Sequence, residues 1–566
     1  MPSGSKPTAI VIGAGVGGVA LATRLAKAGY KVDVYEKNDF IGGRCSLIFD
    51  GEYRFDQGPS LLLLPDLFRE TFVELGTTLE DAGVKLLKCD PNYLVHFHDG
   101  ETFKLSTDLA VMKGEVEKVE GKDGFERYLS WLQEAHRHYE LSVEHVLKKN
   151  FYSFFSLMRP TFLWNVFALH PHVSIWTCAS KFFKTERLRR VFTFGSMYMG
   201  VSPFDAPGTY SLLQYTELAE GIWYPIGGFN AVVQALVNLA KTHTLDVTYH
   251  LSAPVKSVNV SSVAGKPRAT GILLDSGEDV HADIIVCNAD LVYSYKELLP
   301  KNVEAERLDK KPGSCSSISF YWSMSEKIPQ LGTHNVFLAE HYESSFTSIF
   351  ADQELPIEPS FYVNVPSRVD SSAAPEGKDA IVVLVPVGHL GGPLGLKEGR
   401  MSEVVDIARR KVLATIEGRV GMERGEFQKK IAHEIVNTPE TWRDKFNLDK
   451  GAILGLSHSF FNVLSFRPRT KHPEIEGCYF VGASTHPGTG VPICLAGAKI
   501  TASQIVADAR NESLYPTADY KPGRSAVGLD AVTSSSFTVQ FATAVLAAIF
   551  AYALWMLASA GVLLSQ

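Results

Sequence analysis

A short run of glycines near the N-terminus constrains the fold of this chain more than any other feature. The apolar residues 8–12 lead directly into the segment 13–18, whose sequence Gly-Ala-Gly-Val-Gly-Gly is a G-x-G-x-x-G pattern. Residues 16–28 follow with the apolar spacing of a helix, and 31–36 then read as a second strand. This order of strand, glycine turn, helix and strand predicts a βαβ unit, and hence an α/β fold.

Each glycine of this turn has its own physical role. Gly13 permits the tight turn, and Gly15 lets the backbone approach a pyrophosphate because it has no side chain. Gly18 lets the helix pack closely on the strand, and the start of that helix presents free N–H groups to the phosphates. Glu36 ends the second strand, where a carboxylate accepts hydrogen bonds from a ribose hydroxyl. The sequence therefore predicts a site for the ADP half of NAD or FAD.

Two further segments favour FAD over NAD. A Gly-Gly-Arg loop follows Glu36, and it would bring backbone amides and one guanidinium to the phosphates or the flavin. A turn of small residues comes next, with the sequence Phe-Asp-Gln-Gly-Pro-Ser at 55–60. The candidate cofactor-binding residues of these two segments are Gly42, Gly43, Arg44, Gly58, Pro59 and Ser60.

A third glycine-rich segment lies near the other end of the chain. A short apolar run at 478–482 is followed by a glycine-rich loop and by a predicted helix to about residue 509. Such a turn can place N–H donors at the far end of an extended dinucleotide. For His486 in this loop, an acid–base role and a structural role are both open. The candidate cofactor-binding residues are Gly482, Gly490, Val491 and Pro492, together with Val255 from the β-patterned segment 246–290.

The charge balance and the cysteines exclude several classes of protein. The 566 residues carry 55 Lys and Arg against 62 Asp and Glu, a net charge of −7, so no nucleic-acid partner is expected. Charged residues make up only 21% and aromatic residues 11%, which excludes disorder for most of the chain. Seven cysteines without a C-x-x-C pair predict reduced thiols in a cytosol-facing protein, with neither a disulfide framework nor a metal site.

The C-terminal segment predicts a membrane anchor. No charged residue occurs in 531–566, and 541–564 is almost unbrokenly apolar. As a helix this stretch would be about 36 Å long, enough to cross a hydrocarbon core of about 30 Å. Lys521 and Arg524 precede it, which predicts a single-pass C-terminal anchor with a cytosol-facing body, in the endoplasmic reticulum membrane. A buried core helix is the alternative interpretation.

A second apolar stretch, at 151–176, is rich in aromatic residues. Pro160 and Pro171 divide it into pieces that are too short to span a bilayer. It fits either a buried helical hairpin or a surface that dips into one leaflet of a membrane.

Together these motifs resemble the phytoene desaturases of bacteria and fungi, and of the fungal branch in particular. The similarity covers about residues 8–510, and the segments that carry it are 13–18 with Glu36, 42–44, 55–65, 202–211, 221–228 and above all 481–492. The resemblance implies a Rossmann-like FAD-binding domain of the amine-oxidase and GDI type. This domain would be joined to an α+β substrate domain and to a C-terminal transmembrane helix.

The reaction that this resemblance implies is the stepwise dehydrogenation of phytoene in carotenoid biosynthesis. The products would be phytofluene, zeta-carotene, neurosporene and lycopene, with 3,4-didehydrolycopene as a further end point. Because the substrate is a long hydrocarbon, the protein would have membrane lipids as partners and would bind the substrate in an apolar tunnel. The acceptor of electrons from the flavin would be a quinone or oxygen, with NAD as a remaining alternative. The end product and the oligomeric state stay open.

No catalytic residue is assigned from the sequence. Each desaturation passes a hydride to the flavin and a proton to a base, and the protein mainly orients the chain. The ionisable residues near the apolar stretches are more typical of solvated faces and ion pairs than of catalysts; they are Arg127, Glu134, His136, Glu217 and Glu220.

Two alternative functions share the implied fold. The first is a related flavoenzyme, such as a carotene isomerase, a retinol saturase or an amine oxidase. The second is a flavin-less carrier of lipidated GTPases, which Glu36 and the three glycine segments disfavour.

The domain organisation predicted from the sequence alternates between cofactor and substrate regions. The segments are 1–105 (FAD-binding, first part), 106–225 (helical substrate and membrane-contact region), 226–312 (FAD-binding, second part), 313–465 (substrate domain), 466–513 (FAD-binding, C-terminal part), 514–536 (linker) and 537–564 (transmembrane helix).

Overall fold

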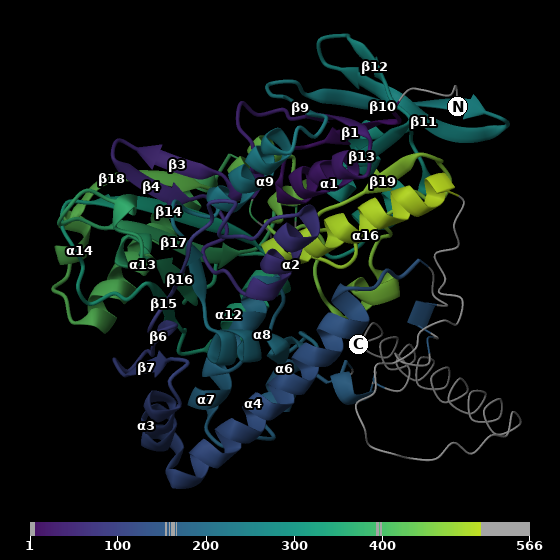
Figure 1. The fold of residues 1–566 in the computed structure, drawn as a ribbon. Coiled ribbons are helices and arrows are strands. Elements are labelled where there is room, and N and C mark those ends of the chain that lie inside the picture. The colour runs from purple at the N-terminus through teal and green to yellow at the C-terminus, as the bar shows by residue number, and fades with distance from the viewer. Residues whose placement is uncertain are drawn as a thin grey trace, which may run out of the picture. The chain divides into compact units, whose positions relative to one another are not determined.

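The N-terminal βαβ unit lies at the centre of a five-stranded parallel sheet (Figure 1). The structure is a computed structural model that describes residues 6–510 except 153–155, 158, 160–164, 166, 172, 392–395 and 397–398. The strand order is β19 (Cys478–Phe480), β13 (Ile284–Cys287), β1 (Thr8–Ile12), β2 (Lys31–Tyr35) and β9 (Val247–His250). Since all five strands are parallel, the glycine turn after β1 and the loops after β13 and β19 share one edge of the sheet.

Helices cover this sheet and keep water from its strands. Helix α1 (Val16–Lys27) packs against both α16 (Val491–Arg510) and α9 (Asn230–Thr242) (Figure 1). Ala9, Val11 and Ile285 are 1% exposed or less. Burial on both faces explains why the central strands are continuous apolar runs rather than alternating ones.

A seven-stranded sheet forms the second large layer. Its order is β18 (Ile431–Asn437), β14 (Ser316–Met324), β17 (Ala380–Val387), β16 (Phe361–Asn364), β15 (His334–Phe337), β6 (Tyr93–His96) and β7 (Thr102–Leu105). Only β15 and β6 pair in parallel; the other neighbours are antiparallel. Helix α13 (Met401–Val420) shares an apolar core with this sheet, and that core includes Phe320, Trp322 and Val412. The sheet therefore joins strands from before residue 106 with strands from after residue 315.

The remaining strands of the described residues form three small sheets. These are β10 (Val255–Val263) with β11 (Lys266–Leu274) and β12 (Asp279–His281), β3 (Leu47–Asp50) with β4 (Tyr53–Asp56), and β5 (Leu86–Lys88) with β8 (Trp223–Pro225). The β pattern that the sequence predicts within 246–290 is confirmed by β9, by the strands β10 to β12 and by β13.

The helical character predicted for 106–225 is also confirmed. This region holds α3 (Leu109–Glu120), α4 (Lys122–Ser142), α6 (Ile175–Ala179), α7 (Glu186–Val191) and α8 (Leu212–Tyr215), with short turns of helix η2 (Val143–Leu147), η4 (Phe167–Leu169), η5 (Phe194–Met199), η6 (Gly208–Ser211) and η7 (Thr216–Glu220). The other α-helices of the described residues are α2 (Pro65–Leu75), α10 (Leu291–Tyr293), α11 (Val303–Asp309), α12 (Tyr342–Phe350), α14 (Glu426–Lys429) and α15 (Pro439–Phe446). The domain boundaries proposed from the sequence stay a prediction.

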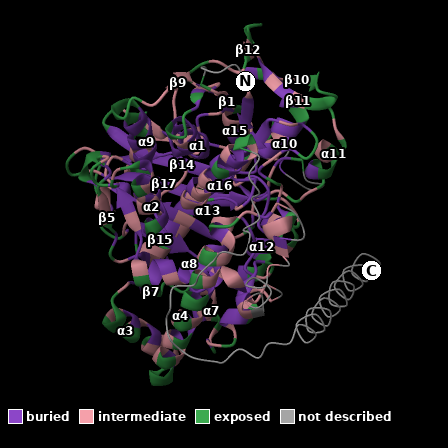
Figure 2. Cartoon of the chain, turned by 45° about the vertical axis from the view of Figure 1, so that its right-hand side comes forward, coloured by how far each residue is buried: buried purple, intermediate pink, exposed green. Residues whose placement is uncertain are grey.

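Burial follows the two large sheets. Buried residues concentrate along the strands and on the inner faces of the helices, whereas exposed residues gather on α3 and on the outer strands β10 to β12 (Figure 2). Trp131, Trp322 and Trp442 are fully buried and belong to three separate apolar clusters. All seven cysteines are free and buried, as expected for reduced thiols.

The predicted transmembrane helix is the part of the fold that needs correction. Within the described residues, none of the helices is both long enough and apolar enough to cross a bilayer. The segment predicted for that role, 537–564, lies outside the described residues. The fold class is therefore corrected to the α/β architecture of the two large sheets alone.

The second apolar stretch, 151–176, is described only in part. Phe151, Leu169 and Ile175 are buried, with exposed fractions of 4% or less. Eleven positions between 153 and 172 are outside the described residues, so the hairpin and the membrane surface both remain interpretations.

Candidate functional site

The glycine turn after β1 can be formed only with glycine at its key positions. Gly13 has a φ of +98°, and its N–H donates to the Tyr35 carbonyl at 2.7 Å. A Cβ added at Gly18 would lie 2.3 Å from the Gly13 carbonyl oxygen, a distance no side chain tolerates. The N-cap of α1 is Gly15, so no side chain competes for the free N–H groups of its first turn. The start of α1 thus presents its backbone donors at the edge of the sheet, as the sequence predicts.

The Gly42–Gly43 loop lies directly against this turn. The Gly42 N–H donates to the Ala14 carbonyl at 2.9 Å. A Cβ at Gly43 would lie 3.3 Å from the Gly15 Cα, and a Cβ at Gly42 would lie 2.7 Å from the amide nitrogen of Asn230. Two glycine segments therefore form one continuous backbone surface, which fits the approach of a dinucleotide pyrophosphate.

Glu36 is fixed at the same edge and is only 6% exposed. Its Oε2 accepts a hydrogen bond from the Ala14 N–H at 2.8 Å, and its Oε1 accepts from the Asn38 N–H at 2.9 Å. The carboxylate thus holds the glycine turn in shape through both of its oxygens.

The other N-terminal candidates are more dispersed. Arg44 donates from Nη1 to the Ile453 carbonyl, so in this structure it reaches a backbone oxygen. Gly58 lies against Arg44, because a Cβ there would be 2.8 Å from the Arg44 carbonyl oxygen. The half-buried Pro59 leads to Ser60, whose hydroxyl lies 2.9 Å from the Tyr362 hydroxyl on β16.

Val255 lies in the core rather than in a glycine turn. It begins β10 and belongs to an apolar cluster with Ile12 and Tyr35 of the parallel sheet. The N–H of Ala253, two residues earlier, donates to the Glu36 carbonyl at 2.8 Å. Val255 is therefore two residues away from a backbone contact with Glu36, and its side chain packs in the apolar core.

The C-terminal glycine segment joins the N-terminal turn, although more than 460 positions separate them in the sequence. Gly482 has a φ of +126°, and a Cβ at Gly17 would lie 3.7 Å from the Gly482 Cα. Gly490 has a φ of +104° and immediately precedes α16, which begins at Val491 and Pro492. Two helix N-termini, those of α1 and α16, therefore follow glycine turns at the same end of the parallel sheet.

Two residues that hold this arrangement together were missed in the sequence. Asn288 follows β13, and its Nδ2 donates to the Gly13 carbonyl at 3.0 Å. Arg467 is buried and donates to the carbonyls of Ala483 and, at 3.1 Å, of Thr485. Burial lowers the pKa of Arg467 to about 10, which leaves it charged at neutral pH. Asn288 could have been found from its place just after a buried strand, whereas no local signal points to Arg467.

His486 has a structural environment. Its Nε2 lies 2.7 Å from the Lys149 carbonyl oxygen, and its ring packs edge-on against Phe151. Burial lowers its pKa to about 4, so the imidazole is neutral at physiological pH.

A buried acid lies at the interface between the helical region and the seven-stranded sheet. Glu217 on η7 is 1% exposed, and burial raises the pKa of its carboxyl to about 8. It accepts hydrogen bonds from the Tyr93 hydroxyl at 3.1 Å and from the Gln214 amide at 2.9 Å. The Tyr198 hydroxyl in turn donates to Tyr93 at 2.8 Å.

A second polar chain lies beside this acid and leads to Ser60. The His334 Nδ1 is 2.7 Å from the Tyr362 hydroxyl, which also contacts Ser60. The Tyr93 and His334 rings are 5.9 Å apart. Burial lowers the pKa of His334 to about 3, so its ring is neutral. The buried Glu217 and Tyr93, together with the half-buried Tyr198 and Tyr362, thus form a group of proton-holding side chains next to one of the predicted cofactor segments.

The other ionisable residues considered from the sequence form ordinary polar contacts. Arg127 pairs with Glu120 at 2.5 Å, and the exposed His136 lies 3.5 Å from Glu140. Glu134 accepts from Arg137 at 2.8 Å, and Glu220 accepts from Thr216 at 2.9 Å. Glu217 is the one of the five that is fully enclosed.

Comparison with known proteins places the chain in a family. It matches the family described as flavin containing amine oxidoreductase over residues 16–506. It is 57% identical to a phytoene desaturase of Fusarium fujikuroi, over 97% of this chain and 98% of the relative. A phytoene desaturase of Neurospora crassa is 58% identical, over 88% of this chain and 84% of the relative.

Solved structures agree on the fold. Putrescine oxidase bound to putrescine aligns with a TM-score of 0.57 at 15% identity, over 89% of this chain and 99% of that structure. At this identity the likeness concerns the fold alone, and it supports an amine-oxidase-type α/β architecture. The family match and the two sequence relatives show that the chain belongs to the phytoene desaturases of the flavin containing amine oxidoreductase family.

Proposed function

We propose that this protein is a phytoene desaturase that uses FAD to remove hydrogen from CH–CH bonds of a carotene. The observation that carries the proposal is the meeting of three glycine segments with Glu36 at one edge of the parallel sheet. Added Cβ atoms at Gly15, Gly18 or Gly42 would fall 3.0 Å or less from neighbouring atoms. This surface of bare backbone suits a dinucleotide, and a carrier without flavin would have no use for it.

The chain's own residues divide the work of holding the cofactor. The N–H groups at the start of α1 and the Gly42–Gly43 loop would bind the pyrophosphate, and Glu36 would bind the ribose. The turn from Gly482 to Gly490 and the start of α16 would bind the far end. When bound, the flavin supplies the acceptor for a hydride.

Glu217 is the group best suited to take the proton. Once ionised, a carboxyl with a pKa of about 8 is a stronger base than an exposed glutamate, and its burial favours the protonated form. Tyr93 and Gln214 hold the carboxyl in place. A role in proton transfer would explain why this carboxyl is enclosed, whereas a role in an ion pair or on a solvated surface would not.

The end product in this proposal is lycopene or 3,4-didehydrolycopene, and the substrate is taken from membrane lipids. A hydrocarbon without polar groups dissolves in a bilayer rather than in water. A quinone or oxygen would reoxidise the flavin, with NAD as the alternative acceptor. The seven free, buried thiols support a body that faces the cytosol.

The test is incubation of the flavin-loaded protein with phytoene-bearing liposomes, followed by chromatography of the pigments. Carotenes with additional double bonds support the proposal. Isomerised or saturated products would point instead to a related flavoenzyme. Protein that stays colourless after addition of FAD would point to a carrier.

A further inference from the structure

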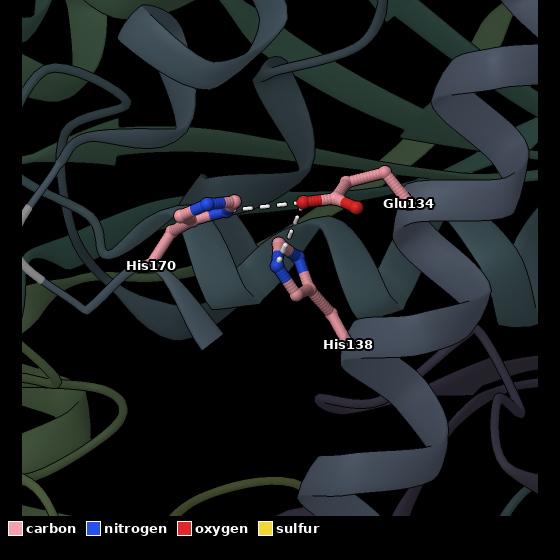
Figure 3. A group of neighbouring side chains, drawn as sticks. All are labelled: Glu134, His138 and His170. Atoms are coloured by element: carbon pink, nitrogen blue, oxygen red, sulfur yellow. Dashed lines mark ion pairs between the residues drawn. The ribbon is translucent and has the colours of Figure 1, made fainter. Parts of the chain in front are cut away.

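Three potential metal ligands converge within the helical region. Glu134 and His138 lie one turn apart on α4, and His170 follows η4 (Figure 3). The Glu134 Oε1 is 3.5 Å from the His138 Nε2 and 3.1 Å from the His170 Nδ1. All three ligand atoms lie within 4.8 Å of one another. Ligands bound to one zinc ion at about 2.0–2.2 Å are separated by similar distances.

The contacts of His138 prepare one nitrogen for a metal. Its side chain is fully buried. The Nδ1 lies 2.7 Å from the Ser211 hydroxyl. If Nδ1 carries the proton and donates it to Ser211, the lone pair of Nε2 faces Glu134. A second hydrogen bond of this kind is typical of histidines that bind metals, because it fixes the tautomer and the ring.

Two of the ligand side chains have further contacts in this structure, which holds no ion. The His138 Nε2 is also 3.0 Å from the Ala168 carbonyl oxygen, and Arg137 donates to the Glu134 Oε1 at 2.8 Å. Metal binding would move the His138 proton from Nε2 to Nδ1 and release Arg137, which is half-exposed, toward solvent. The Ala168 carbonyl would then lie beside the ion as a further oxygen.

The backbone at His170 is also unusual. Its φ is +45°, in the left-handed region that residues other than glycine seldom adopt, and Pro171 follows it. This conformation turns the imidazole toward α4, where Glu134 lies (Figure 3).

We propose that Glu134, His138 and His170 bind a divalent transition-metal ion, best suited to Zn²⁺, that links α4 to residues 167–170. Two imidazoles and one carboxylate are the ligand set of zinc and its neighbours, whereas Mg²⁺ and Ca²⁺ prefer oxygen ligands alone. The ion would link residues 167–170 of the apolar stretch 151–176 to α4. Nothing in this proposal depends on the desaturase activity.

The experiment uses the full, flavin-loaded chain freed of metal and titrated with Co²⁺, whose tetrahedral complexes absorb visible light. The expected result is one ion per chain, displaced by Zn²⁺ and not by Mg²⁺. His170→Ala and Glu134→Gln should each weaken binding at least about 10-fold. Flavin content and the circular dichroism spectrum show whether each variant is folded.

His136→Ala is the matched control. His136 and Glu140 form an exposed histidine–glutamate pair on the same helix, also four residues apart and 3.5 Å from each other. Among the described residues, no third potential ligand joins this pair. This variant should bind Co²⁺ like the unchanged protein. The proposal is overturned if no ion binds, if His170→Ala and Glu134→Gln bind as tightly as the unchanged protein, or if His136→Ala loses binding equally.

Discussion

The candidate site has two regions of different construction. Backbone groups form the region at the edge of the five-stranded sheet, and side chains form the region beside the seven-stranded sheet. The first region consists of glycine turns at 13–18, 42–43 and 482–490, with Glu36 as its main side chain. The second centres on Glu217 and takes tyrosines from β6, η5 and β16. Backbone sites need glycine at fixed spacing, which is visible in a sequence. Side-chain clusters need only that distant segments meet, which is not.

The largest expected effect comes from adding one methyl group to the backbone region. In Gly18→Ala the new Cβ would lie 2.3 Å from the Gly13 carbonyl oxygen, so the turn or the helix must move. We expect a loss of about 3 kcal/mol in the free energy of unfolding and loss of bound flavin. Denaturant unfolding and the flavin content of the purified protein measure both effects.

Gly114→Ala is the control for that change. Gly114 is an exposed position within α3 and has no neighbouring atom within 4 Å of an added Cβ. The substitution should stabilise the protein by about 0.5–1 kcal/mol with flavin content unchanged. If Gly18→Ala behaved like Gly114→Ala, the close packing of the glycine turn would be refuted.

A smaller effect is expected from Glu36→Ala. The substitution leaves the N–H groups of Ala14 and Asn38 without their acceptor and removes the ribose partner. The expected loss is about 1–3 kcal/mol of stability, together with weaker retention of FAD during dialysis. Glu36→Gln, which keeps an acceptor oxygen, should retain more flavin than Glu36→Ala. Unchanged flavin content in both variants would count against the ribose assignment.

The side-chain region is probed by the pH dependence of stability. The pKa of Glu217 rises from its ordinary 4.5 to about 8 on folding, so the folded state binds more protons and stability falls as pH rises through this range. Buried histidines such as His96 and His486 have pKa values lowered to about 4. Because they are neutral in the folded state, they reduce the stability of the protein only below about pH 6.5. Between pH 6.5 and 8, Glu217 should therefore account for a fall of about 1 kcal/mol per pH unit.

Glu217→Gln should flatten this slope, measured as the urea midpoint at several pH values. Glu220→Gln, on the same helical turn but only half-buried, serves as the control and should keep the slope. An unchanged slope in Glu217→Gln would mean that the carboxyl is not enclosed as the structure has it. If Glu217 also takes the proton in turnover, Glu217→Gln should lower kcat more than flavin content.

Much of the backbone region could be predicted from the sequence because its signals are local. The βαβ unit, Glu36 and the helix after Gly490 each follow from residues close together in the chain. Asn288 was missed although it stands just after a predicted strand, because an asparagine at a strand end has many other uses.

The side-chain region could not be predicted in the same way. The parallel pairing of β6 with β15 joins residues 94–96 to 335–337, and no pattern in either strand indicates its partner. Glu217 was considered but could not be distinguished from solvated residues, since burial depends on that long-range pairing. The His138 and His170 cluster was missed for the same reason, because 31 residues separate its two histidines in the sequence.

The most direct measurement is the absorption spectrum of the flavin-loaded protein mixed with phytoene-bearing liposomes in the absence of oxygen and quinone. We expect the bound flavin to be bleached as phytoene loses hydrogen, and its colour to return when oxygen or a quinone is admitted. A flavin that stays oxidised while the protein is folded and phytoene is present would contradict this expectation.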